Sequence, residues 1–365
     1  MEIKTFEDFI LFARECEASD IHLTVGAPTV FRVHGELRKF SELRGEEDYS
    51  PVAINRMIHA MLNADQEEVI NSGKDLDFSF ELSTGARQRV NVFHQCGKLA
   101  ATIRLLHTEI PSAEALRIPK VVQDLAKKKR GLILVTGPTG SGKTTTLASI
   151  IRLINENRAC HVITIEDPIE YRYENAKATI HQREIGADVA DFGSSLRSAL
   201  REDPDVIFVG EMRDYETISL AITAAETGHL VLATLHTTGA AETINRIIDV
   251  FPPHGQAQVR SQLSTILEAV ISQTLIPTAD HNGRVCAFDI LLGTDAVKNL
   301  IRSEKTFQMD SIMQQSRKVG MTTFNDSIAR LYDLDLISYE DAMANSNNKE
   351  ELDKMLTKIQ QNKLI

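Results

Sequence analysis

The 365-residue sequence contains no tryptophan, only four cysteines and no apolar run that approaches the roughly 20 residues needed to cross a bilayer. The cysteines are far apart and form no C-x-x-C pair, which fits reduced thiols and gives no zinc site. The first residues lack the basic and apolar regions of a secretory signal. We therefore expect a cytoplasmic protein that associates with any membrane only through a protein partner.

Positive charge is in deficit, with 40 Lys and Arg against 51 Asp and Glu and a net charge of −11 at pH 7. This excess of negative charge argues against broad binding to nucleic acid or to anionic lipid, so no nucleic-acid partner is expected. The rest of the composition is that of a globular protein, and 365 residues are too many for one hydrophobic core. We therefore predict two domains.

One motif dominates what the sequence does contain. Residues 137–144 match the complete P-loop pattern G-x-x-x-x-G-K-[ST], between a strand-like stretch at 132–135 and a helix-compatible stretch at 145–151. A strand, a glycine-rich turn and a helix start aim backbone N–H groups at an anion on the positive end of the helix dipole. In such loops the lysine, here Lys143, reaches the β- and γ-phosphates, and the Thr144 hydroxyl ligates Mg²⁺. The predicted nucleotide-binding residues are Gly137, Pro138, Thr139, Gly140, Ser141, Gly142, Lys143, Thr144 and Thr145.

Three further apolar stretches, at 162–165, 206–209 and 230–235, predict buried strands of a parallel sheet covered by helices on both faces. Each stretch ends in polar residues, and ligands of such sheets bind at the carboxyl ends of the strands. We therefore predict an α/β fold with one catalytic crevice, formed by the P-loop and these three strand ends.

The polar residues at the strand ends suit the hydrolysis of a nucleoside triphosphate. Glu211 is placed to hold Mg²⁺ through water, and Glu170 or Glu166 to polarise the attacking water. His229 and His236 flank the third strand beside the predicted phosphate site. The alternative is structural, because carboxylates at such places also cap helices and a buried histidine is more often a satisfied core residue. The sequence leaves both interpretations open.

The chain is predicted to divide into an N-terminal domain at 1–107, a linker at 108–118, a P-loop core at 119–295 and a helical region at 296–365. The first domain is predicted to be α+β, with a helix at 51–71 between alternating stretches typical of strands. These predicted strands lie at 18–25, 30–34, 76–82, 87–93 and 99–106. The polar stretch 345–365 predicts a loosely packed terminal helix.

Several motifs together resemble the secretion-type ATPase family, which powers type IV pili and type II and IV secretion. Residues 165–170 resemble its Asp box, 205–214 its atypical Walker B, with glutamate after glycine, and 223–238 its His box. Residues 296–302 are similar, with mild departures, to a segment of the family's pilus retraction ATPases. The resemblance covers most of the chain.

This resemblance implies a fold, an activity and partners. The fold is a RecA-like P-loop NTPase core with a smaller N-terminal PAS-like α+β domain, assembled as a homohexamer that binds ATP and Mg²⁺. The function is that of a motor coupling ATP hydrolysis to type IV pilus retraction, the disassembly that drives twitching motility. The implied partner is an inner-membrane pilus platform protein, through which the ATPase is peripheral to the inner membrane.

The resemblance also implies roles for individual residues. Glu170 is the expected general base and Glu211 a metal ligand, while His229 and His236 sense or stabilise the γ-phosphate. Arginines on the N-terminal strands match arginines that approach the phosphates in this family, a role that suits planar guanidinium groups. They are Arg87, Arg89 and Arg104. The alternative is that these arginines face outward without a ligand.

Other functions stay open at this stage. Pilus assembly and type II secretion ATPases usually carry further N-terminal domains and a tetracysteine zinc insertion, whereas Cys286 is the only cysteine after Glu211. An accessory retraction ATPase usually differs in the P-loop and the His box. A DNA-translocating P-loop motor predicts stimulation by DNA, and a scaffold that binds ATP without turnover predicts that Lys143 is dispensable.

Overall fold

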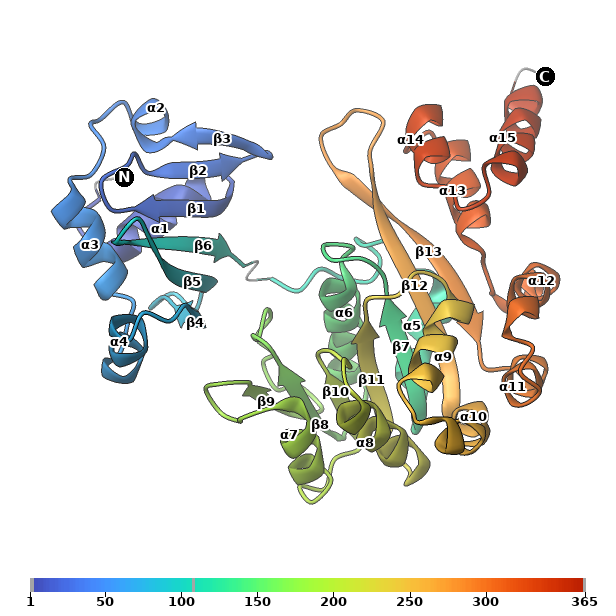
Figure 1. Cartoon of the computed structure of the whole chain (residues 1–365). Helices are drawn as coiled ribbons and strands as arrows, with labels where there is room; N and C mark the ends of the chain where they lie inside the picture. The colour runs from blue at the N-terminus through green and yellow to red at the C-terminus, as the bar shows by residue number, and fades with distance from the viewer. Residues whose placement is uncertain (1–2, 107–108, 364–365) are drawn as a thin grey trace. The chain divides into compact units, whose positions relative to one another are not determined.

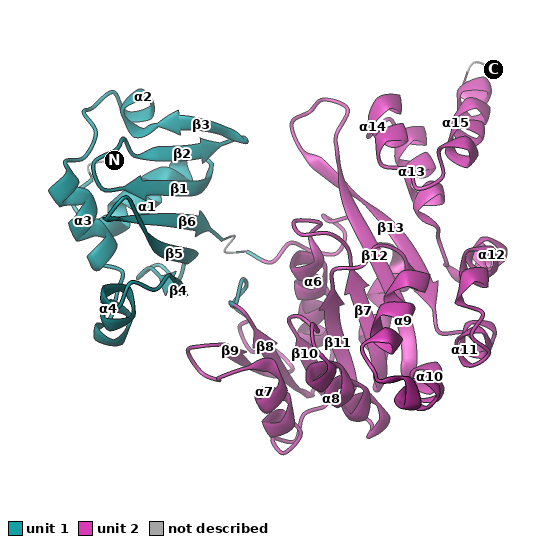
Figure 2. Cartoon of the chain, in the orientation of Figure 1, with its two compact units in different colours: residues 1–109, 168–172 teal, residues 110–167, 173–365 magenta. Residues whose placement is uncertain are grey.

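The computed structural model describes residues 3–106 and 109–363. By its internal contacts the chain separates into two units, which are coloured separately in Figure 2. Unit 1 comprises residues 1–109 together with 168–172, and unit 2 comprises 110–167 and 173–365. The predicted boundary between residues 107 and 108 lies outside the described residues, so the predicted domain limits stay predictions.

Unit 1 is built on a six-stranded antiparallel sheet with the strand order β3-β2-β1-β6-β5-β4 (Figure 1). Its strands are β1 (Ala18–Thr24), β2 (Val30–Val33), β3 (Glu36–Lys39), β4 (Leu76–Glu81), β5 (Arg87–Gln95) and β6 (Lys98–Leu105). Its helices are α1 (Phe6–Glu15), α2 (Phe40–Arg44), α3 (Pro51–His59) and α4 (Ala64–Asn71). All the predicted strands of this α+β module are present, and β3 is added to them.

One face of this sheet is apolar because side chains alternate along each strand. In β1, Ile21 is fully buried among apolar side chains, whereas its neighbour Asp20 lies on the opposite face. On the apolar side, the rings of Phe9 from α1, Phe31 from β2 and Phe40 from α2 pack against one another. The opposite face carries the polar side chains discussed below.

The stretch predicted to be helical at 51–71 is confirmed as helical, and it is divided into the two helices α3 and α4. Ala60 ends α3, and Asn63 caps α4 by accepting a hydrogen bond from the N–H of Gln66. Asparagine is among the strongest N-cap residues, and this cap lies inside the predicted helix.

The turn between β5 and β6 has two residues, Cys96 and Gly97, since Gln95 pairs directly with Lys98. Both turn residues have positive φ, 49° and 72°, as the type I′ hairpin turn requires. Cys96 is exposed at this turn.

Unit 2 is built on a seven-stranded sheet with the strand order β13-β12-β7-β11-β10-β8-β9. Its strands are β7 (Gly131–Thr136), β8 (His161–Glu166), β9 (Thr179–Glu184), β10 (Val206–Val209), β11 (Leu230–Leu235), β12 (Leu267–Pro277) and β13 (Arg284–Leu292). The four predicted strands are confirmed as β7, β8, β10 and β11. The prediction of a wholly parallel sheet is wrong, because β13 pairs antiparallel with β12. Neither of these two strands, nor β9, was predicted.

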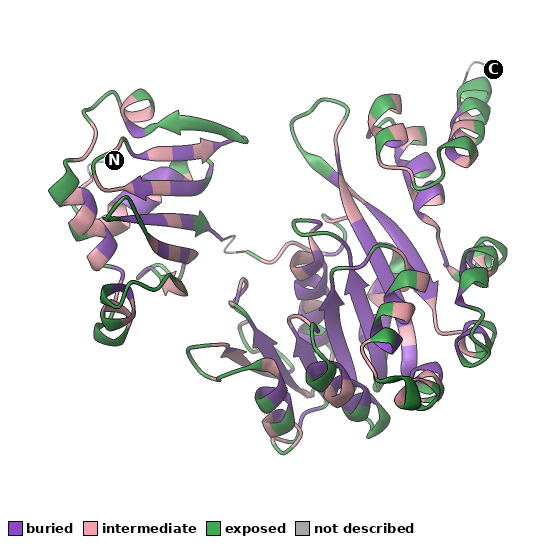
Figure 3. Cartoon of the chain, in the orientation of Figure 1, coloured by how far each residue is buried: buried purple, intermediate pink, exposed green. Residues whose placement is uncertain are grey.

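Helices cover both faces of this sheet, as predicted, because successive side chains of each strand point to opposite sides. Leu132 and Leu134 of β7 belong to a core shared with α7 to α10, whereas Ile133 and Val135 pack with α5 and α6. Figure 3 shows the central strands as almost wholly buried. These helices are α5 (Lys120–Asp124), α6 (Lys143–Asn157), α7 (Phe192–Ala199), α8 (Tyr215–Glu226), α9 (Ala240–Asp249) and α10 (Pro253–Ile266).

The chain after β13 is helical, as predicted. Its helices are α11 (Asp295–Arg302), α12 (Met309–Gln315), α13 (Phe324–Asp333), α14 (Tyr339–Ala344) and α15 (Lys349–Lys363). The prediction that the last stretch packs loosely is wrong for the described part of it. Leu352 and Leu356 of α15 are fully buried in a core with α13, α14 and the outer parts of β12 and β13. Met355 and Ile359 of the same helix also pack against this core, so α15 has an apolar side although most of its residues are polar.

Candidate active site

The P-loop lies between β7 and α6, as predicted. Helix α6 begins at Lys143, directly after Gly142, which has a left-handed conformation with φ 86°. Lys143 is buried, and its Nζ donates to the carbonyl oxygens of Gly137 at 2.8 Å and of Pro138 at 3.0 Å. The loop therefore holds a positive charge next to a helix N-terminus, an arrangement that suits the binding of phosphate groups.

Gln273 of β12 contacts the P-loop, although it is not among the residues predicted from the sequence. It is 1 % exposed, and its Nε2 donates to the carbonyl oxygen of Ser141 at 2.6 Å. A Cβ atom on Gly137 would lie 2.3 Å from the carbonyl oxygen of Gln273, so the two backbones are in close contact there. The sequence signal that could have identified Gln273 is a glutamine inside the mostly apolar stretch 269–276.

This close contact predicts that Gly137→Ala destabilises the protein by about 1–3 kcal/mol. The φ of Gly137 is 144°, and the added Cβ would overlap the Gln273 carbonyl. Gly140→Ala is the matched control, because Gly140 also has a positive φ of 77° but no atom within 4 Å of an added Cβ. Urea unfolding of both variants measures the difference, and equal midpoints would contradict the prediction.

Parallel strands bring three of the predicted site residues to the edge of the sheet that holds the P-loop. In the strand order, β11 lies next to β7, followed by β10 and β8, and all these pairings are parallel. His236 follows β11, Glu211 follows β10 after one glycine, and Glu166 ends β8. Because carboxyl ends of parallel strands share an edge, these side chains and the P-loop form one functional edge in unit 2.

Glu211 and His236 contact each other at this edge. Nε2 of His236 lies 3.1 Å from a carboxylate oxygen of Glu211, and a guanidinium nitrogen of Arg213 donates to the other oxygen at 2.6 Å. Burial, the largest single influence, raises the pKa of Glu211, but the hydrogen bond from Arg213 and the charges of His236 and Arg213 outweigh it. The pKa of Glu211 therefore lies below its usual value, and the carboxylate is ionised at neutral pH. Arg213 is not among the site residues predicted from the sequence.

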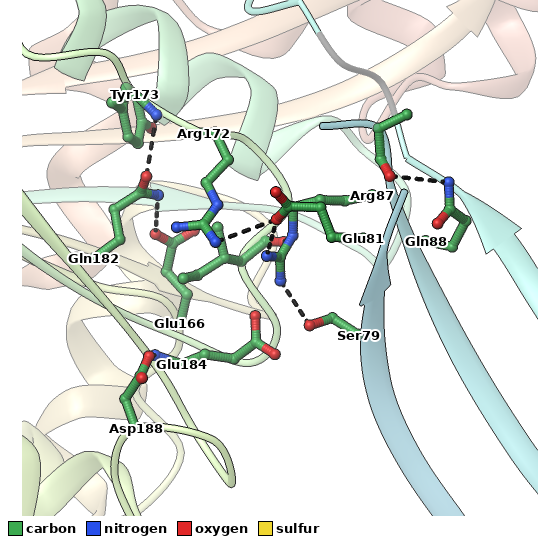
Figure 4. A network of polar contacts seen from close by, with 12 residues as sticks. Ser79, Glu81, Arg87, Gln88, Glu166, Arg172, Tyr173, Gln182, Glu184 and Asp188 are labelled. Atoms are coloured by element: carbon green, nitrogen blue, oxygen red, sulfur yellow. Dashed lines mark hydrogen bonds and ion pairs between the residues drawn. The ribbon is translucent and has the colours of Figure 1, made fainter. Parts of the chain in front are cut away.

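Glu166 is buried and hydrogen-bonded within unit 2. It is 3 % exposed, and its Oε1 accepts from the Thr164 hydroxyl at 2.6 Å and from Nε2 of Gln182 at 3.3 Å. Figure 4 shows Gln182 between Glu166 and the backbone of Tyr173. These contacts fit the structural alternative for Glu166, because a buried carboxylate needs such donors.

Glu170 belongs to the segment 168–172, which groups with unit 1. Within unit 1, Nε of Arg87 donates to the carbonyl oxygen of Ile169, the residue before Glu170, at 3.1 Å. The contact gives the segment a fixed attachment point on β5. The predicted role of Glu170 as general base stays a prediction.

Arg87 is the most buried of the three predicted arginines. Besides Ile169, its guanidinium donates to Glu81 at 3.1 Å and to the Ser79 hydroxyl at 2.6 Å, both on the neighbouring strand β4 (Figure 4). Glu81 also accepts from Arg172 at 3.2 Å. These contacts support a structural role for Arg87 within unit 1.

Arg89 and Arg104 lie directly opposite each other on β5 and β6, on the polar face of the unit 1 sheet. Their side chains are 43 % and 63 % exposed, and each has an acidic neighbour, Asp77 at 3.7 Å and Asp20 at 2.9 Å. Two like charges paired across strands repel each other unless an anion joins them. Here each guanidinium group has a carboxylate beside it, and the role of Arg89 and Arg104 in phosphate binding stays a prediction.

His229 precedes β11 and His236 follows it, so the two histidines flank this strand as predicted and lie at its opposite ends. The carbonyl oxygen of His229 accepts from the N–H of Gly131 at the start of β7, and its Nδ1 lies 2.9 Å from the carbonyl oxygen of Ala224. The six residues of β11 separate the two ends by roughly 20 Å. A catalytic role for His229 stays a prediction.

In the part of the chain that the structure describes, no three His, Cys, Asp or Glu side chains cluster as a metal site. In the same part, no helix has the length and apolar character that a membrane span demands.

The fold and the site described above are those of a P-loop NTPase with an additional N-terminal module. Residues 3–362 match the family model of the type II/IV secretion system proteins, and the chain belongs to this family. The chain is 47 % identical to the twitching motility protein of Neisseria gonorrhoeae, over 88 % of this chain and 85 % of that protein. It is 45 % identical to the type IV pilus retraction ATPase PilT of Pseudomonas aeruginosa, over 92 % of this chain and 96 % of PilT.

A solved structure also matches most of the chain. The crystal structure of the pilus retraction motor PilT with bound ADP superimposes with a TM-score of 0.89 and 46 % identity. The match covers 97 % of this chain and 100 % of that one. The predicted fold class, a RecA-like P-loop core with a smaller N-terminal PAS-like α+β domain, is confirmed by this agreement.

Proposed function

We propose that this protein is an ATP-hydrolysing motor that retracts type IV pili. It works as a homohexameric ring in the cytoplasm and acts on an inner-membrane pilus platform protein, through which alone it reaches the membrane. The retraction ATPases among its relatives support this function. The observation that carries the proposal is the common edge of the unit 2 sheet, where the P-loop and the Glu211–His236 pair lie at the ends of parallel strands.

The residues at this edge fit Mg²⁺ as the partner of ATP. The hydroxyl of Thr144 and the ionised carboxylate of Glu211 are the hard oxygen donors that Mg²⁺ prefers. Since both carboxylate oxygens of Glu211 already accept from Arg213 or His236, Glu211 would hold the ion through water. Bound Mg²⁺ neutralises charge on the phosphate oxygens. Few protein ligands are needed, because Mg²⁺ usually keeps several waters.

In the hydrolysis step that we propose, the remaining site residues have separate roles. Glu170 takes a proton from the attacking water, whose oxygen forms a bond to the γ-phosphorus while the bond to the bridging oxygen of ADP breaks. Lys143 and His236 stabilise charge on the phosphate oxygens, with Thr145 and the other loop residues binding the nucleotide. Arg89 and Arg104 supply guanidinium groups as charge develops on the transferred phosphoryl group.

Arg104→Ala is expected to lower kcat roughly 10- to 100-fold and to change the KM for ATP by less than about threefold. The reason is that a guanidinium group acting on developing charge contributes more to the transition state than to the bound substrate. Phosphate release at varied ATP concentration separates the two constants. Arg32→Ala is the matched control, because Arg32 faces Asp20 from β2 at 4.0 Å. A loss of ATP affinity with unchanged kcat would contradict the role.

The direction of the motor is tested in the host cell by deleting the gene and counting surface pili. Retraction predicts excess pili that do not retract, and restoration by the wild-type gene but not by a Lys143→Ala copy. Bald cells would instead indicate pilus assembly. Stimulation of the purified ATPase several-fold by DNA would favour a DNA-translocating motor.

A further inference from the structure

Three buried polar residues form a row across the neighbouring strands β13, β12 and β7, next to the start of the P-loop. Asp289 of β13 pairs directly with Ser272 of β12, and Ser272 pairs directly with Thr136, the last residue of β7. The three residues are 5 %, 0 % and 0 % exposed. Because burying polar groups costs free energy unless they are hydrogen-bonded, such a row needs a reason.

Hydrogen bonds join this row to the loop that follows β11. The hydroxyls of Thr136 and Ser272 are 2.6 Å apart, and Ser272 also accepts from the N–H of Gly239 at 3.1 Å. Oδ2 of Asp289 accepts from the N–H of Ala240 at 3.3 Å. Gly239 ends the loop that begins with His236, and Ala240 is the first residue of α9, whereas Thr136 is the residue before the P-loop.

A second hydroxyl chain reaches the same loop from helix α9. The hydroxyl of Thr243 lies 2.8 Å from that of Thr237 and 3.4 Å from that of Thr136. The loop after β11 is therefore bonded at Thr237 and Gly239 to hydroxyls that also contact Thr136 at the end of the P-loop strand. The helix start that follows this loop is bonded at Ala240 to Asp289, the strand partner of Ser272.

Asp289 takes the place of a helix cap. Helix α9 begins after Gly239, and glycine has no side chain that could accept from the first N–H groups of the helix. The carboxylate of Asp289, on the separate strand β13, accepts from one of these groups instead. Burial, followed by the charge of Asp310 on α12, raises the pKa of Asp289 to about 7, while the hydrogen bond from the N–H of Ala240 acts in the opposite direction. Asp310 is the charged group that acts on Asp289, and the N–H of Ala240 in α9 is its hydrogen-bond donor.

We propose that Asp289 is a positioning residue for ATP hydrolysis: with Ser272, it holds the loop that carries His236 in register with the P-loop strand. This inference rests on the proposed ATPase function, since the loop matters through His236 and its partner Glu211. Neither Asp289 nor Ser272 touches the nucleotide; they act through the loop.

The proposal is tested on the full-length chain with Asp289→Ala, Asp289→Asn and Ser272→Ala. Asp289→Ala is expected to lower kcat about tenfold with a change of less than about threefold in the KM for ATP, because loop position affects the transition state most. Asp289→Asn keeps an oxygen that can accept from Ala240, so it should recover most of this loss. The double variant Asp289→Ala/Ser272→Ala should be little worse than either single one, since both act on one loop.

Hydrogen exchange supplies a readout that does not depend on turnover. Exchange of the amides of Gly239 and Ala240 should be at least about tenfold faster in Asp289→Ala. In the wild type, the exchange rate of these two amides, corrected for intrinsic exchange, should fall from pH 6 to pH 8. The reason is that the Asp289 carboxylate ionises over this range and becomes a stronger acceptor. Asp289→Asn should remove this pH dependence.

Asp326→Ala is the matched control, since it removes another hydrogen-bonded carboxylate of unit 2, the one that caps α13 and pairs with Arg317 at 2.7 Å. It should reduce stability without changing kcat. Wild-type exchange at residues 239–240 in Asp289→Ala, or an equal loss of kcat in Asp326→Ala and Asp289→Ala, would overturn the proposal. If the wild type hydrolyses no ATP, the proposed function fails, while the exchange result still decides whether Asp289 holds the loop.

Discussion

Alanine at Lys143 is expected to lower kcat for ATP at least about 100-fold while the protein stays folded. The ammonium group lies inside the P-loop, against the carbonyl oxygens of Gly137 and Pro138, and it is the charge placed to meet the phosphates. Alanine keeps the helix start but removes that charge. Phosphate release measures turnover, and circular dichroism shows whether the fold is kept.

Lys128→Ala is the matched control for this variant. Lys128 lies shortly before β7, and its Nζ pairs with Glu268 at 2.7 Å, so its loss removes a lysine ion pair of the same unit without touching the P-loop. Its kcat should equal that of the wild type. Wild-type hydrolysis by Lys143→Ala would show that the nucleotide site has been misassigned, and undiminished pilus function in cells would favour the scaffold alternative.

Glu211→Gln is expected to lower kcat by roughly 100- to 1,000-fold. The amide has nearly the same shape but no charge, so it neither attracts Mg²⁺ nor pairs with Arg213 and His236 as the carboxylate does. Glu202→Gln is the matched control, because Glu202, in the segment after α7, forms a similar ion pair with Arg183 at 2.8 Å and contacts neither the P-loop nor Glu211. Turnover by Glu211→Gln at the level of Glu202→Gln would rule out the metal role.

The lowered pKa of Glu211 also sets the sign of a pH effect. A carboxyl group whose pKa is lower in the folded protein stabilises the fold above its unfolded pKa, and this contribution is lost as the pH falls through the folded value. The stability difference between the wild type and Glu211→Gln should therefore be constant at neutral pH and shrink below about pH 4.5. Urea unfolding at several pH values measures it.

Local signals in the sequence were enough for the P-loop and its neighbouring strands. The residues of the loop are contiguous, and the strands β8, β10 and β11 are continuous apolar runs that only a doubly covered sheet accepts. The strand ends then converge for a topological reason, which is why Glu211 and His236 could be placed at one edge in advance.

Features that depend on pairing between distant strands were not predictable in this way. Strand β12 was missed because Ser272 and Gln273 interrupt its apolar run, although both have buried partners supplied by other elements. The contacts of His229 with Gly131 and Ala224 were likewise not predictable, because they join the start of β11 to β7 and α8. Helix α15 was predicted to pack loosely because most of its residues are polar, although Leu352 and Leu356 are buried in a hydrophobic core.

The exposed turn between β5 and β6 has a practical consequence. Cys96 is exposed there, whereas the other three cysteines are partly covered, and burial raises the pKa of each of their thiols. Because the thiolate is the reactive form, a maleimide dye should attach selectively to Cys96. The native chain thus offers a single labelling position on unit 1, from which fluorescence could follow that unit through a nucleotide cycle without any engineered cysteine.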